Sequence, residues 1–319
     1  MHNKALAPLP SACSELQSSD WLGLLHTAGV VLITIAGLML SRWGGLLWFI
    51  GQILFAVALV QWFIILHECG HETLFRSRRL NVFAGHVASF FSVIPFHCWK
   101  RVHASHHRWT GWQDLDPTTA SLVPRRLSRF ERSLINFSWR YWIPIFSIIY
   151  RINNYWNIPR LRRLYGNRDD WRRMLVNTIA LLFFYGFIVS AFGLRETIEM
   201  VGLGLFFAMF FEDPLILSQH THIPQLASGG QKVRPFAAFE QETFTRSLRF
   251  PTLFSTFVLF NFDAHELHHM YPFVPGYHLR RIAYAGVNEV HWWTWIRAVK
   301  QIPGDQFLFR NRNNSGAMV

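Results

Sequence analysis

Three groups of closely spaced histidines are the residues of this sequence best suited to metal chemistry. They are His67 and His71, then His103, His106 and His107, then His265, His268 and His269. On a helix, side chains four residues apart lie on one face, so the two imidazoles of the first group can reach the same metal ion. Neutral imidazole is a good ligand for iron, zinc and copper. The three groups together offer eight ligands, and His220 or His222 could supply a ninth.

The number of imidazoles predicts how many metal ions are bound. One ion takes about four to six ligands, so eight or nine histidines predict a dimetal site. A bound histidine usually passes its second ring N–H to a carboxylate or a carbonyl. We expect the acidic residues near the three groups to orient the histidines in this way: Glu68, Asp114, Asp116, Asp263 and Glu266. For Asp114 and Asp116, the alternative is a solvated loop or a helix cap.

The surroundings of the histidines favour two irons and O₂ as a co-substrate. Two nonredox metals would suit hydrolysis, whereas two irons suit O₂ activation. The chain contains 30 Phe and 14 Trp, and 51% of its residues are hydrophobic. A site reached from a bilayer and lined by aromatic residues suits a long apolar substrate, whose unactivated C–H bonds need a strong oxidant.

Two other interpretations of the histidines have to be compared with this one. The sequence His67-Glu68-x-x-His71 is also a zinc protease pattern, with two zinc ligands and a general base. That interpretation uses the first group and one further ligand, and it leaves both HxxHH groups unexplained. A non-enzymatic metal clamp is the third interpretation. Isolated histidines are usually uninvolved in metal binding, but two HxxHH groups are not isolated.

Four apolar segments are long enough to cross a bilayer: residues 21–40, 45–66, 174–194 and 197–217. The first histidine group directly follows the second segment. We therefore predict an all-α integral membrane protein with four transmembrane helices in two hairpins. A cytoplasmic helical cap, formed by residues 67–173 and 218–310, would hold the dimetal site. Residues 1–310 form a single domain in this prediction, and residues 311–319 a disordered tail.

Two further apolar segments are interrupted and do not read as spans. Pro95 breaks residues 80–99, and Arg140 and Pro144 break residues 133–150. If residues 80–99 crossed the bilayer, the second histidine group would lie on the opposite side from the first. We therefore expect both segments to be interfacial or re-entrant.

Two acids lie near the inner end of the fourth span. Carboxylates at membrane depth usually line a site or a cavity. Glu212 and Asp213 therefore either line a substrate tunnel or support the metal site.

The distribution of charge predicts the orientation of the chain and excludes nucleic-acid binding. The formal net charge is +12, but apolar runs without charge alternate with arginine-rich segments, as in membrane proteins. Arg42 and Arg195 are the only basic residues in the two short turns between paired spans. The positive-inside rule therefore makes the two long segments and both termini cytoplasmic. Every histidine group then lies on the same face of the membrane.

Four stretches of the sequence resemble the membrane-bound fatty acid desaturase family, with its HxxxH, HxxHH and HxxHH boxes. The likeness runs from about residue 60 to 280. Residues 67–71 and 95–111 are similar to the first two boxes of the acyl-lipid desaturase branch. Residues 219–222 (Gln-His-Thr-His) resemble a stretch of plant-type oleate desaturases, and residues 265–277 resemble the third box with its Pro and Tyr tail. Some members carry an Asn-x-x-x-His element before the third box, but Ile216 and Ser218 stand four residues before His220 and His222.

The resemblance implies an enzyme that uses two irons, O₂ and electrons from a separate donor to place a double bond in a fatty acyl chain. Hydroxylation, carotenoid ketolation and oxidative decarboxylation stay open, because the same chemistry can lead to each. No His-Pro-Gly-Gly haem motif is visible. We therefore expect the donor to be a separate, acidic ferredoxin or cytochrome b5 with its reductase, attracted by the basic cytoplasmic face. Carried over by position, the metal ligands are His67, His71, His103, His106, His107, His265, His268 and His269, with His220 a better candidate than His222 for the extra one.

Overall fold

The computed structural model describes residues 16–316, and most of these residues are helical. Residues 1–15 and 317–319 lie outside the described part. A small parallel sheet pairs β1 with β2 in the register Leu248 with Val290 and Arg249 with His291. The helices and strands are α1 (Asp20–Leu40), α2 (Gly45–His71), α3 (Arg78–Ser92), α4 (Phe96–Trp109), η2 (Ala120–Leu122), α5 (Arg129–Tyr141), α6 (Ile145–Arg151), η3 (Ile152–Trp156), α7 (Ile158–Leu164), α8 (Arg168–Phe192), α9 (Leu194–His220), η4 (Ala238–Phe244), β1 (Leu248–Arg249), α10 (Thr252–Phe257), α11 (His265–Met270), α12 (Gly276–Leu279), β2 (Val290–His291), α13 (Trp292–Val299), α14 (Gly304–Phe309) and α15 (Arg312–Ser315).

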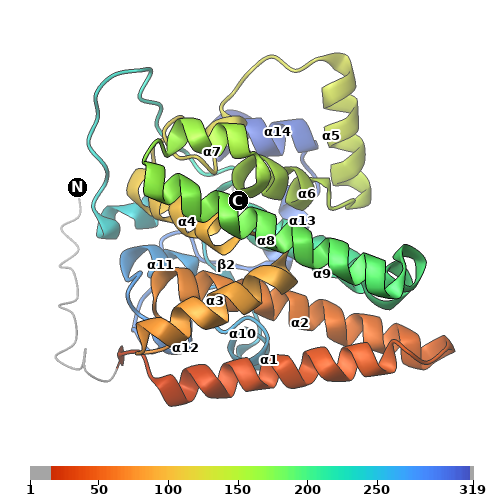
Figure 1. Cartoon of the computed structure of the whole chain (residues 1–319). Helices are drawn as coiled ribbons and strands as arrows, with labels where there is room; N and C mark the ends of the chain where they lie inside the picture. Colours follow the sequence, from red (N-terminus) through yellow and green to blue (C-terminus); the bar gives the residue numbers. More distant parts are fainter. Residues whose placement is uncertain (1–15, 317–319) are drawn as a thin grey trace.

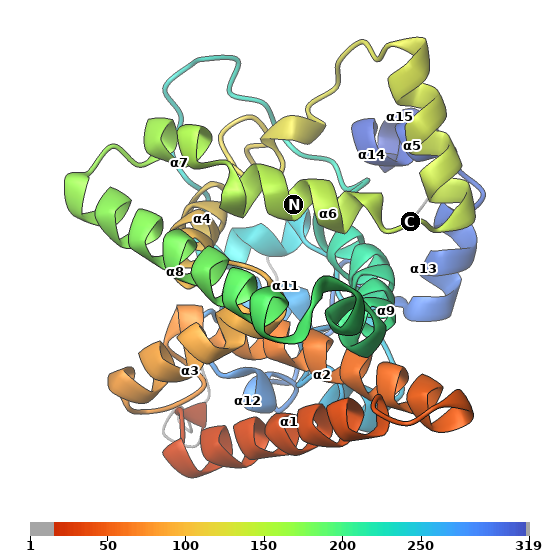
Figure 2. The same cartoon turned by 45° about the vertical axis from the view of Figure 1, so that its right-hand side comes forward.

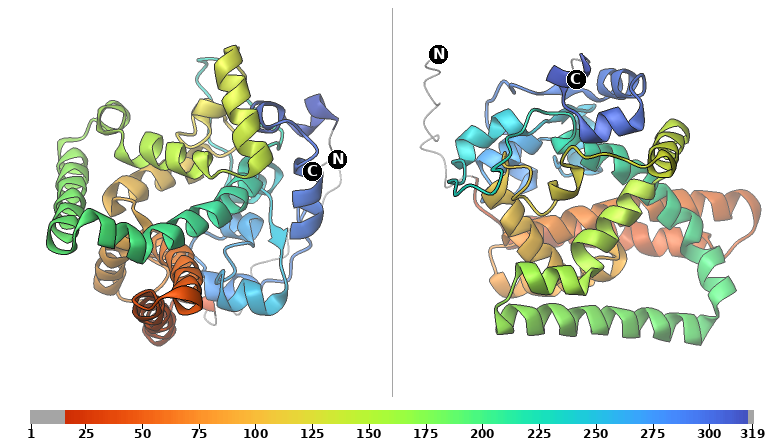
Figure 3. Two further views of the ribbon diagram at one scale, coloured as in Figure 1. Left: turned by 90° about the vertical axis from the view of Figure 1, so that its right-hand side faces the viewer. Right: turned by 90° about the horizontal axis from the view of Figure 1, so that it is seen from above.

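Four helices, α1, α2, α8 and α9, are long and apolar enough to cross a membrane. They coincide with the four predicted apolar segments, but α2 continues through the first histidine group to His71. The turn at residues 41–44 and the turn at Gly193 lie at one end of the molecule, on the right of Figure 1 and of the right-hand view in Figure 3. The helices that carry the histidine groups, α4 and α11, lie toward the other end (Figure 1).

A buried glutamine joins the long helices α2 and α9. Gln52 is fully buried, and its amide nitrogen donates to Ser41 Oγ at 2.8 Å and to the Met200 carbonyl at 2.7 Å. Its amide oxygen accepts from the Gly204 N–H at 2.7 Å. A buried amide is tolerated in an apolar setting when its polar atoms are bonded. These contacts fix how far α9 is shifted along α2, and so where the ends of both helices meet.

We expect Gly204→Ala to destabilise the protein, because its new Cβ would lie 2.8 Å from the Phe55 ring and 3.1 Å from the Gln52 carbonyl oxygen. Overpacking of this kind costs about 1–3 kcal/mol. Gly186→Ala in α8 is the matched control, since no described atom outside the neighbouring residues and backbone of its own helix lies within 4 Å of the added Cβ. Thermal unfolding in detergent should show a lower midpoint for Gly204→Ala only. Equal midpoints for the two variants would contradict this close packing.

The chain bends sharply between α3 and α4, as Pro95 predicts. The two helices meet at 98°. Val93 ends α3 in the left-handed conformation with φ of 54°, and Pro95 directly precedes α4. Ser89 stabilises the bend, because its hydroxyl donates to the Ile94 carbonyl at 2.6 Å and accepts from the Phe96 N–H at 3.1 Å. The bend returns α4 to α2, which brings the second histidine group beside the first.

The interrupted segment 133–150 forms the end of α5 and most of α6, which lie across α8 and α9 from α1 (Figures 1 and 2). Ser128 and Glu131 form a capping box at the start of α5. Trp142 ends this helix with φ of 56°, and Pro144 precedes α6. The apolar side chains of α5 and α6 are partly exposed, as expected for helices at a membrane surface.

The sequence predicts disorder for residues 311–319, but the described part of this segment is ordered. Residues Arg312–Ser315 form α15, and the Arg312 N–H donates to the His222 carbonyl at 3.0 Å. The Arg312 guanidinium also donates to Asn288 Oδ1 at 2.9 Å. These long-range contacts order the segment although its composition is polar.

Candidate metal centre

The histidines converge into two sites, which we call site 1 and site 2. Within each site, the possible ligand atoms all lie within 4.8 Å of one another. Site 1 consists of His67, His71, His103 and His268, and site 2 of His106, His220, His265 and His269. His107 lies against site 1, with its Nε2 3.1 Å from His103 Nε2 and 3.0 Å from His268 Nε2. The structure thus brings together all eight histidines of the three groups and His220.

The helix repeat accounts for three pairs of histidines that share a site. Residues four apart lie on one helix face and serve the same site: the pairs are His67 and His71, His103 and His107, and His265 and His269. His106 and His268 are the remaining members of the two HxxHH groups. His106 of α4 belongs to site 2 and His268 of α11 belongs to site 1, so both helices contribute to both sites. His220, the last residue of α9, completes site 2.

Acceptors on the Nδ1 side orient three of the four imidazoles of site 2. The contacts are His106 Nδ1 to Asp116 Oδ2 at 2.7 Å, His269 Nδ1 to Gln241 Oε1 at 2.8 Å, and His220 Nδ1 to the Phe244 carbonyl at 3.2 Å. A proton held on Nδ1 leaves the Nε2 lone pair free for a metal. Such contacts fix the tautomer and ring orientation of metal ligands.

A buried atom without a partner supports metal binding at site 1. His67 Nε2 is buried and has no hydrogen-bond partner among the described residues, while His67 Nδ1 lies 3.2 Å from Glu68 Oε1. Buried polar atoms are rarely left unpaired, and a metal ion would satisfy this one. Two sets of four imidazoles suit borderline metals such as iron or zinc. The residues therefore fit two ions of this type.

The protonation state of the third histidine group also suits metal binding. Burial, followed by the neighbouring imidazoles of His67 and His71, lowers the pKa of His268 well below its usual range. Burial and the imidazoles of His220 and His106 lower the pKa of His265 in the same way. Both rings are therefore neutral at pH 7, as metal ligands have to be.

Two of the five predicted orienting carboxylates contact a histidine, Glu68 and Asp116, and the other three do not. Asp114 accepts hydrogen bonds from the Ser228 N–H and hydroxyl, at 2.8 and 2.7 Å. This contact corresponds to the loop alternative given for Asp114 above. Asp263 forms an ion pair with Arg280 at 2.6 Å, and Glu266 accepts from the Asn288 N–H at 2.8 Å. Sequence proximity to a histidine did not indicate which way these side chains point.

The orienting role of Gln241 was missed, and so was that of the Phe244 carbonyl. Gln241 lies 28 residues before His269 in the chain. Its amide nitrogen also donates to the His107 carbonyl at 2.8 Å, so this side chain links α4 to α11. A glutamine in a short 3₁₀ segment carries no recognisable sequence signal for such a role.

His222, one of the two candidates for a ninth ligand, does not reach either site. Its Nε2 lies 2.6 Å from Ser315 Oγ, and its Nδ1 lies 3.0 Å from the Arg310 carbonyl. Helix α9 ends at His220, and the chain then turns, with His222 at φ of 66°. The turn directs this side chain to the C-terminal segment, so His220 is the candidate that the structure favours.

The structure speaks against the zinc protease interpretation, because Glu68 is engaged elsewhere. A general base has to face the metal-bound water. Glu68 Oε2 instead accepts from the Gly276 N–H and the Thr73 hydroxyl, both at 2.9 Å, while Oε1 lies beside His67 Nδ1. Its role here is to hold the first histidine group against the segment that follows the third.

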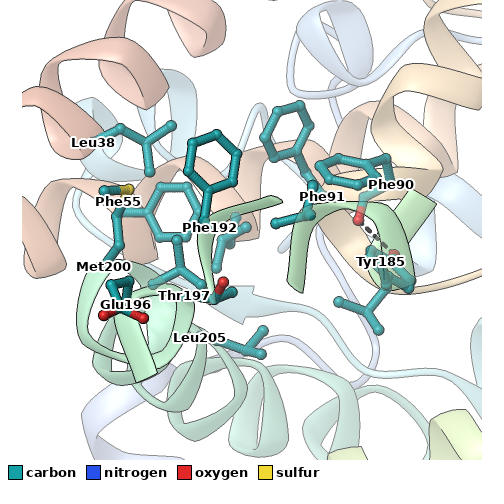
Figure 4. A pocket seen from close by; sticks show the side chains of 14 residues that line it. Leu38, Phe55, Phe90, Phe91, Tyr185, Phe192, Glu196, Thr197, Met200 and Leu205 are labelled. Carbon is teal, nitrogen blue, oxygen red and sulfur yellow. Dashed lines mark hydrogen bonds between the residues drawn. The ribbon is translucent and has the colours of Figure 1, made fainter. Parts of the chain in front are cut away.

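Two pockets lie near the metal centre and along the membrane helices. A small pocket of about 40 Å³ contains histidines of both sites, with Phe63, Tyr150 and Ile216 among its other lining residues. A larger apolar pocket of about 510 Å³ lies between α1, α2, α3, α8 and α9. Figure 4 shows that aromatic side chains, such as those of Phe91 and Phe192, surround it. The first pocket can hold small reactants beside the metals, and the second can hold a hydrocarbon chain.

Glu212 and Asp213 hold α6 against α9 and lie in neither pocket lining. The Glu212 carboxylate forms a buried ion pair with Arg151, and Asp213 Oδ1 accepts from the Ser147 N–H at 2.5 Å. The Arg151 guanidinium lies 6.0 Å from the centre of the Phe63 ring, which lines the small pocket. The two acids therefore support the wall of the metal pocket through α6.

We expect Asp116→Asn to weaken metal binding at site 2. Burial alone would raise the pKa of Asp116, but His106 and the Thr118 N–H hold this pKa below its usual value, so the carboxylate is charged. Loss of such an orienting partner lowers metal affinity by about 10- to 100-fold. Asp114→Asn is the matched control, since Asp114 contacts no histidine. Chelator competition should release one metal earlier from Asp116→Asn alone, and identical release from both variants would contradict the orienting role.

Comparison with known proteins places these features in a family context. A sequence model described as fatty acid desaturase matches residues 41–295. The chain is similar to an Arabidopsis thaliana protein named "Acyl-lipid omega-3 desaturase (cytochrome b5), endoplasmic reticulum", at 24% identity over 305 residues, which covers 86% of this chain and 72% of the relative. It is 33% identical over 122 residues to an "sn-1 oleoyl-lipid 12-desaturase" of Picosynechococcus sp., covering 37% of this chain and 34% of the relative. A third similar protein is the A. thaliana "Temperature-sensitive sn-2 acyl-lipid omega-3 desaturase (ferredoxin), chloroplastic", with 22% identity over 231 residues, 68% of this chain and 51% of the relative.

Proposed function

Because the chain belongs to the fatty acid desaturase family, and is therefore an oxidoreductase, we propose that it is an O₂-dependent di-iron desaturase of fatty acyl chains. One observation carries the proposal: two sites of four imidazoles each open onto the same small pocket. The proposed ligands are the eight histidines of the three groups and His220. The acyl chain can be attached to a lipid, to coenzyme A or to a carrier protein.

The proposed reaction converts a –CH2–CH2– unit into –CH=CH–. One O₂, two electrons, two protons and the two hydrogens of the substrate give the alkene and two water molecules. The irons would supply O₂ activation and the oxidising power to remove hydrogen from unactivated carbon. The protein supplies neutral imidazoles and a pocket that fixes one substrate carbon beside the metals. Positioning of this kind decides which bond reacts.

The apolar pocket supports a long acyl chain as the substrate. Phe63 and His67 line the metal pocket, while Leu59 and Phe55 line the apolar pocket. These four residues are spaced four apart and follow one face of α2. The rise from Phe63 to Phe55 is about 12 Å, within reach of a fatty acyl chain that has its reacting carbon at the metals. We propose that the methyl-terminal part of the chain lies in the apolar pocket.

The proposed topology has four transmembrane helices in two hairpins, with both termini and the metal centre in the cytoplasm. The positions of the two short turns at one end of the molecule and of the histidine helices toward the other support it (Figure 1). Arg42 is the only basic residue in the first turn, and Arg195 follows the second turn in the first turn of α9. In this arrangement residues 67–173 and 218–310 form the cytoplasmic cap, and the donor is a cytoplasmic ferredoxin or cytochrome b5 with its reductase.

The test is a fatty-acid profile by mass spectrometry, from a host without such enzymes that expresses the protein with a compatible reductase. We expect new double bonds with the intact protein and none with His268→Ala. Oxygenated or chain-shortened products would replace the desaturase by a hydroxylase, a ketolase or a decarboxylase with the same metal centre. No new product, together with one zinc and no iron in the purified protein, would overturn the di-iron proposal.

A further inference from the structure

Two neighbouring histidines, His71 of site 1 and His107 beside it, lie closer to the surface than the other histidines of this site. His67, His103 and His268 are buried, whereas His71 and His107 are partly exposed. Their rings lie 4.8 Å apart, centre to centre. His71 Nε2 is 2.7 Å from His103 Nε2, so a partly exposed histidine is in direct contact with a buried one.

The surface beside these two histidines is formed by α4 and is basic. We call it the α4 face and define it by Lys100, Arg101, Ala104 and Arg108. Residues 101, 104 and 108 are exposed, and Lys100 is partly exposed. Ala104 lies one turn from Lys100 and from Arg108, and it immediately follows His103. A small exposed side chain among basic ones leaves the backbone of α4 open to close approach by another protein.

Ion pairs neutralise part of this face, but a positive excess stays. Lys100 pairs with Glu72 at 2.6 Å and Arg101 with Asp170 at 2.9 Å. Arg78 also faces Glu72, at 3.4 Å, and Arg108 has no ion-pair partner in the described part of the chain. Four basic groups therefore stand against two acidic ones at this edge of the metal centre.

His220 is also partly exposed but is a poor site for a protein partner. It borders a narrow cleft of about 40 Å³, lined also by Arg310 and Asn311 of the C-terminal segment. That segment is held in place through His222. A folded protein therefore has closer access to site 1 past the α4 face than to site 2 through this cleft.

We propose that the α4 face is the docking surface for an acidic one-electron carrier protein, and that electrons reach the metal centre through the edge formed by His71 and His107. This inference rests on the proposed function. Each turnover needs two electrons, so a one-electron carrier has to dock twice. Charge complementarity raises the rate of such encounters more than it raises affinity.

The test compares Ala104→Glu with Ala104→Lys, which add side chains of similar length and opposite charge. Thr294→Glu, at an exposed position of α13, controls for the change in net charge; α13 and α4 lie on different sides of the molecule in Figure 2. The holoenzyme is placed in phosphatidylcholine nanodiscs. The probes are the soluble haem domain of cytochrome b5 and a plant-type ferredoxin. The readouts are the Kd of the oxidised probe and the second-order rate of reoxidation of the reduced probe.

We expect Ala104→Glu to lower the reoxidation rate by about tenfold at low salt and to weaken binding, whereas Ala104→Lys lowers neither the rate nor the affinity and Thr294→Glu keeps both. The difference should vanish at about 1 M salt, where the Debye length is near 3 Å. Equal losses in both Ala104 variants would indicate steric blocking without charge recognition and would overturn the proposal. No loss in either would also overturn it. A difference between Ala104→Glu and Ala104→Lys that arises only when the nanodiscs contain phosphatidylserine would also overturn the proposal, because the α4 face would then bind lipid headgroups.

A single turnover driven by dithionite separates this inference from the proposed function. Dithionite is a small reductant and needs no docking surface. If all variants form product with dithionite, the desaturase proposal holds whatever the carrier experiments give. If the intact protein forms no product with dithionite, the proposed function fails. The binding data alone then decide whether the α4 face recognises a carrier.

Discussion

His220→Ala is expected to abolish product formation and to remove about one of the two proposed irons, while His222→Ala leaves metal content and product yield unchanged. His220 Nε2 lies 2.8 Å from His265 Nε2 within site 2, whereas His222 faces Ser315 and Arg310. Loss of one imidazole from a set of four leaves the ion with an incomplete ligand set. The two variants differ by two positions in the chain and remove the same chemical group, so each controls for the other.

Metal content by mass spectrometry and product yield should be measured on both variants in the same membrane preparation. The unfolding midpoint of each apo-protein shows whether folding is affected. If His222→Ala lost activity and metal as His220→Ala does, the placement of α9 relative to α11 would be wrong. If His220→Ala kept both irons, His220 would not be a ligand, and site 2 would depend on its other three histidines.

Breaking the buried ion pair between Arg151 and Glu212 is expected to have the largest effect on stability. Both side chains are buried, at 6% and 2% exposure. Removing one partner, as in Glu212→Leu, leaves an uncompensated buried charge and costs about 3–5 kcal/mol. The double variant Arg151→Met with Glu212→Leu removes both charges and should recover much of this loss. Its activity should stay low, because α6 loses a contact that supports the pocket wall at Phe63.

The exposed pair Arg195 and Glu199 provides a matched control for this experiment. These side chains lie 2.8 Å apart, but they are 84% and 61% exposed, so the Arg195→Met variant should unfold at the same midpoint as the parent protein. Unfolding in detergent, followed by circular dichroism, measures all four proteins. If the double variant were less stable than Glu212→Leu, the pair would contribute net stabilisation beyond the mere avoidance of an unpaired charge.

The sequence by itself determined the long helices and the chemical type of the site. Apolar runs of about twenty residues, three of them without a charged residue, leave few alternatives to long apolar helices, and all four coincide with helices in the structure. Spacings of four residues on a helix also require histidines to share a face, which applies to His67 with His71. The sequence therefore indicated a multi-histidine metal centre, including all three groups, before any contact between them was known.

Only the tertiary structure decided how the histidines are divided and which groups orient them. His106 belongs to a different site from His103 and His107, and His268 to a different site from His265 and His269, because the placement of α4 relative to α11 decides which imidazoles meet. Asp116 reaches a histidine, while Asp114, two residues earlier, bonds to Ser228. Local spacing fixes the direction of a side chain relative to its own helix. The partner that it meets depends on contacts between segments far apart in the chain, such as Glu68 and Gly276, which are 208 residues apart.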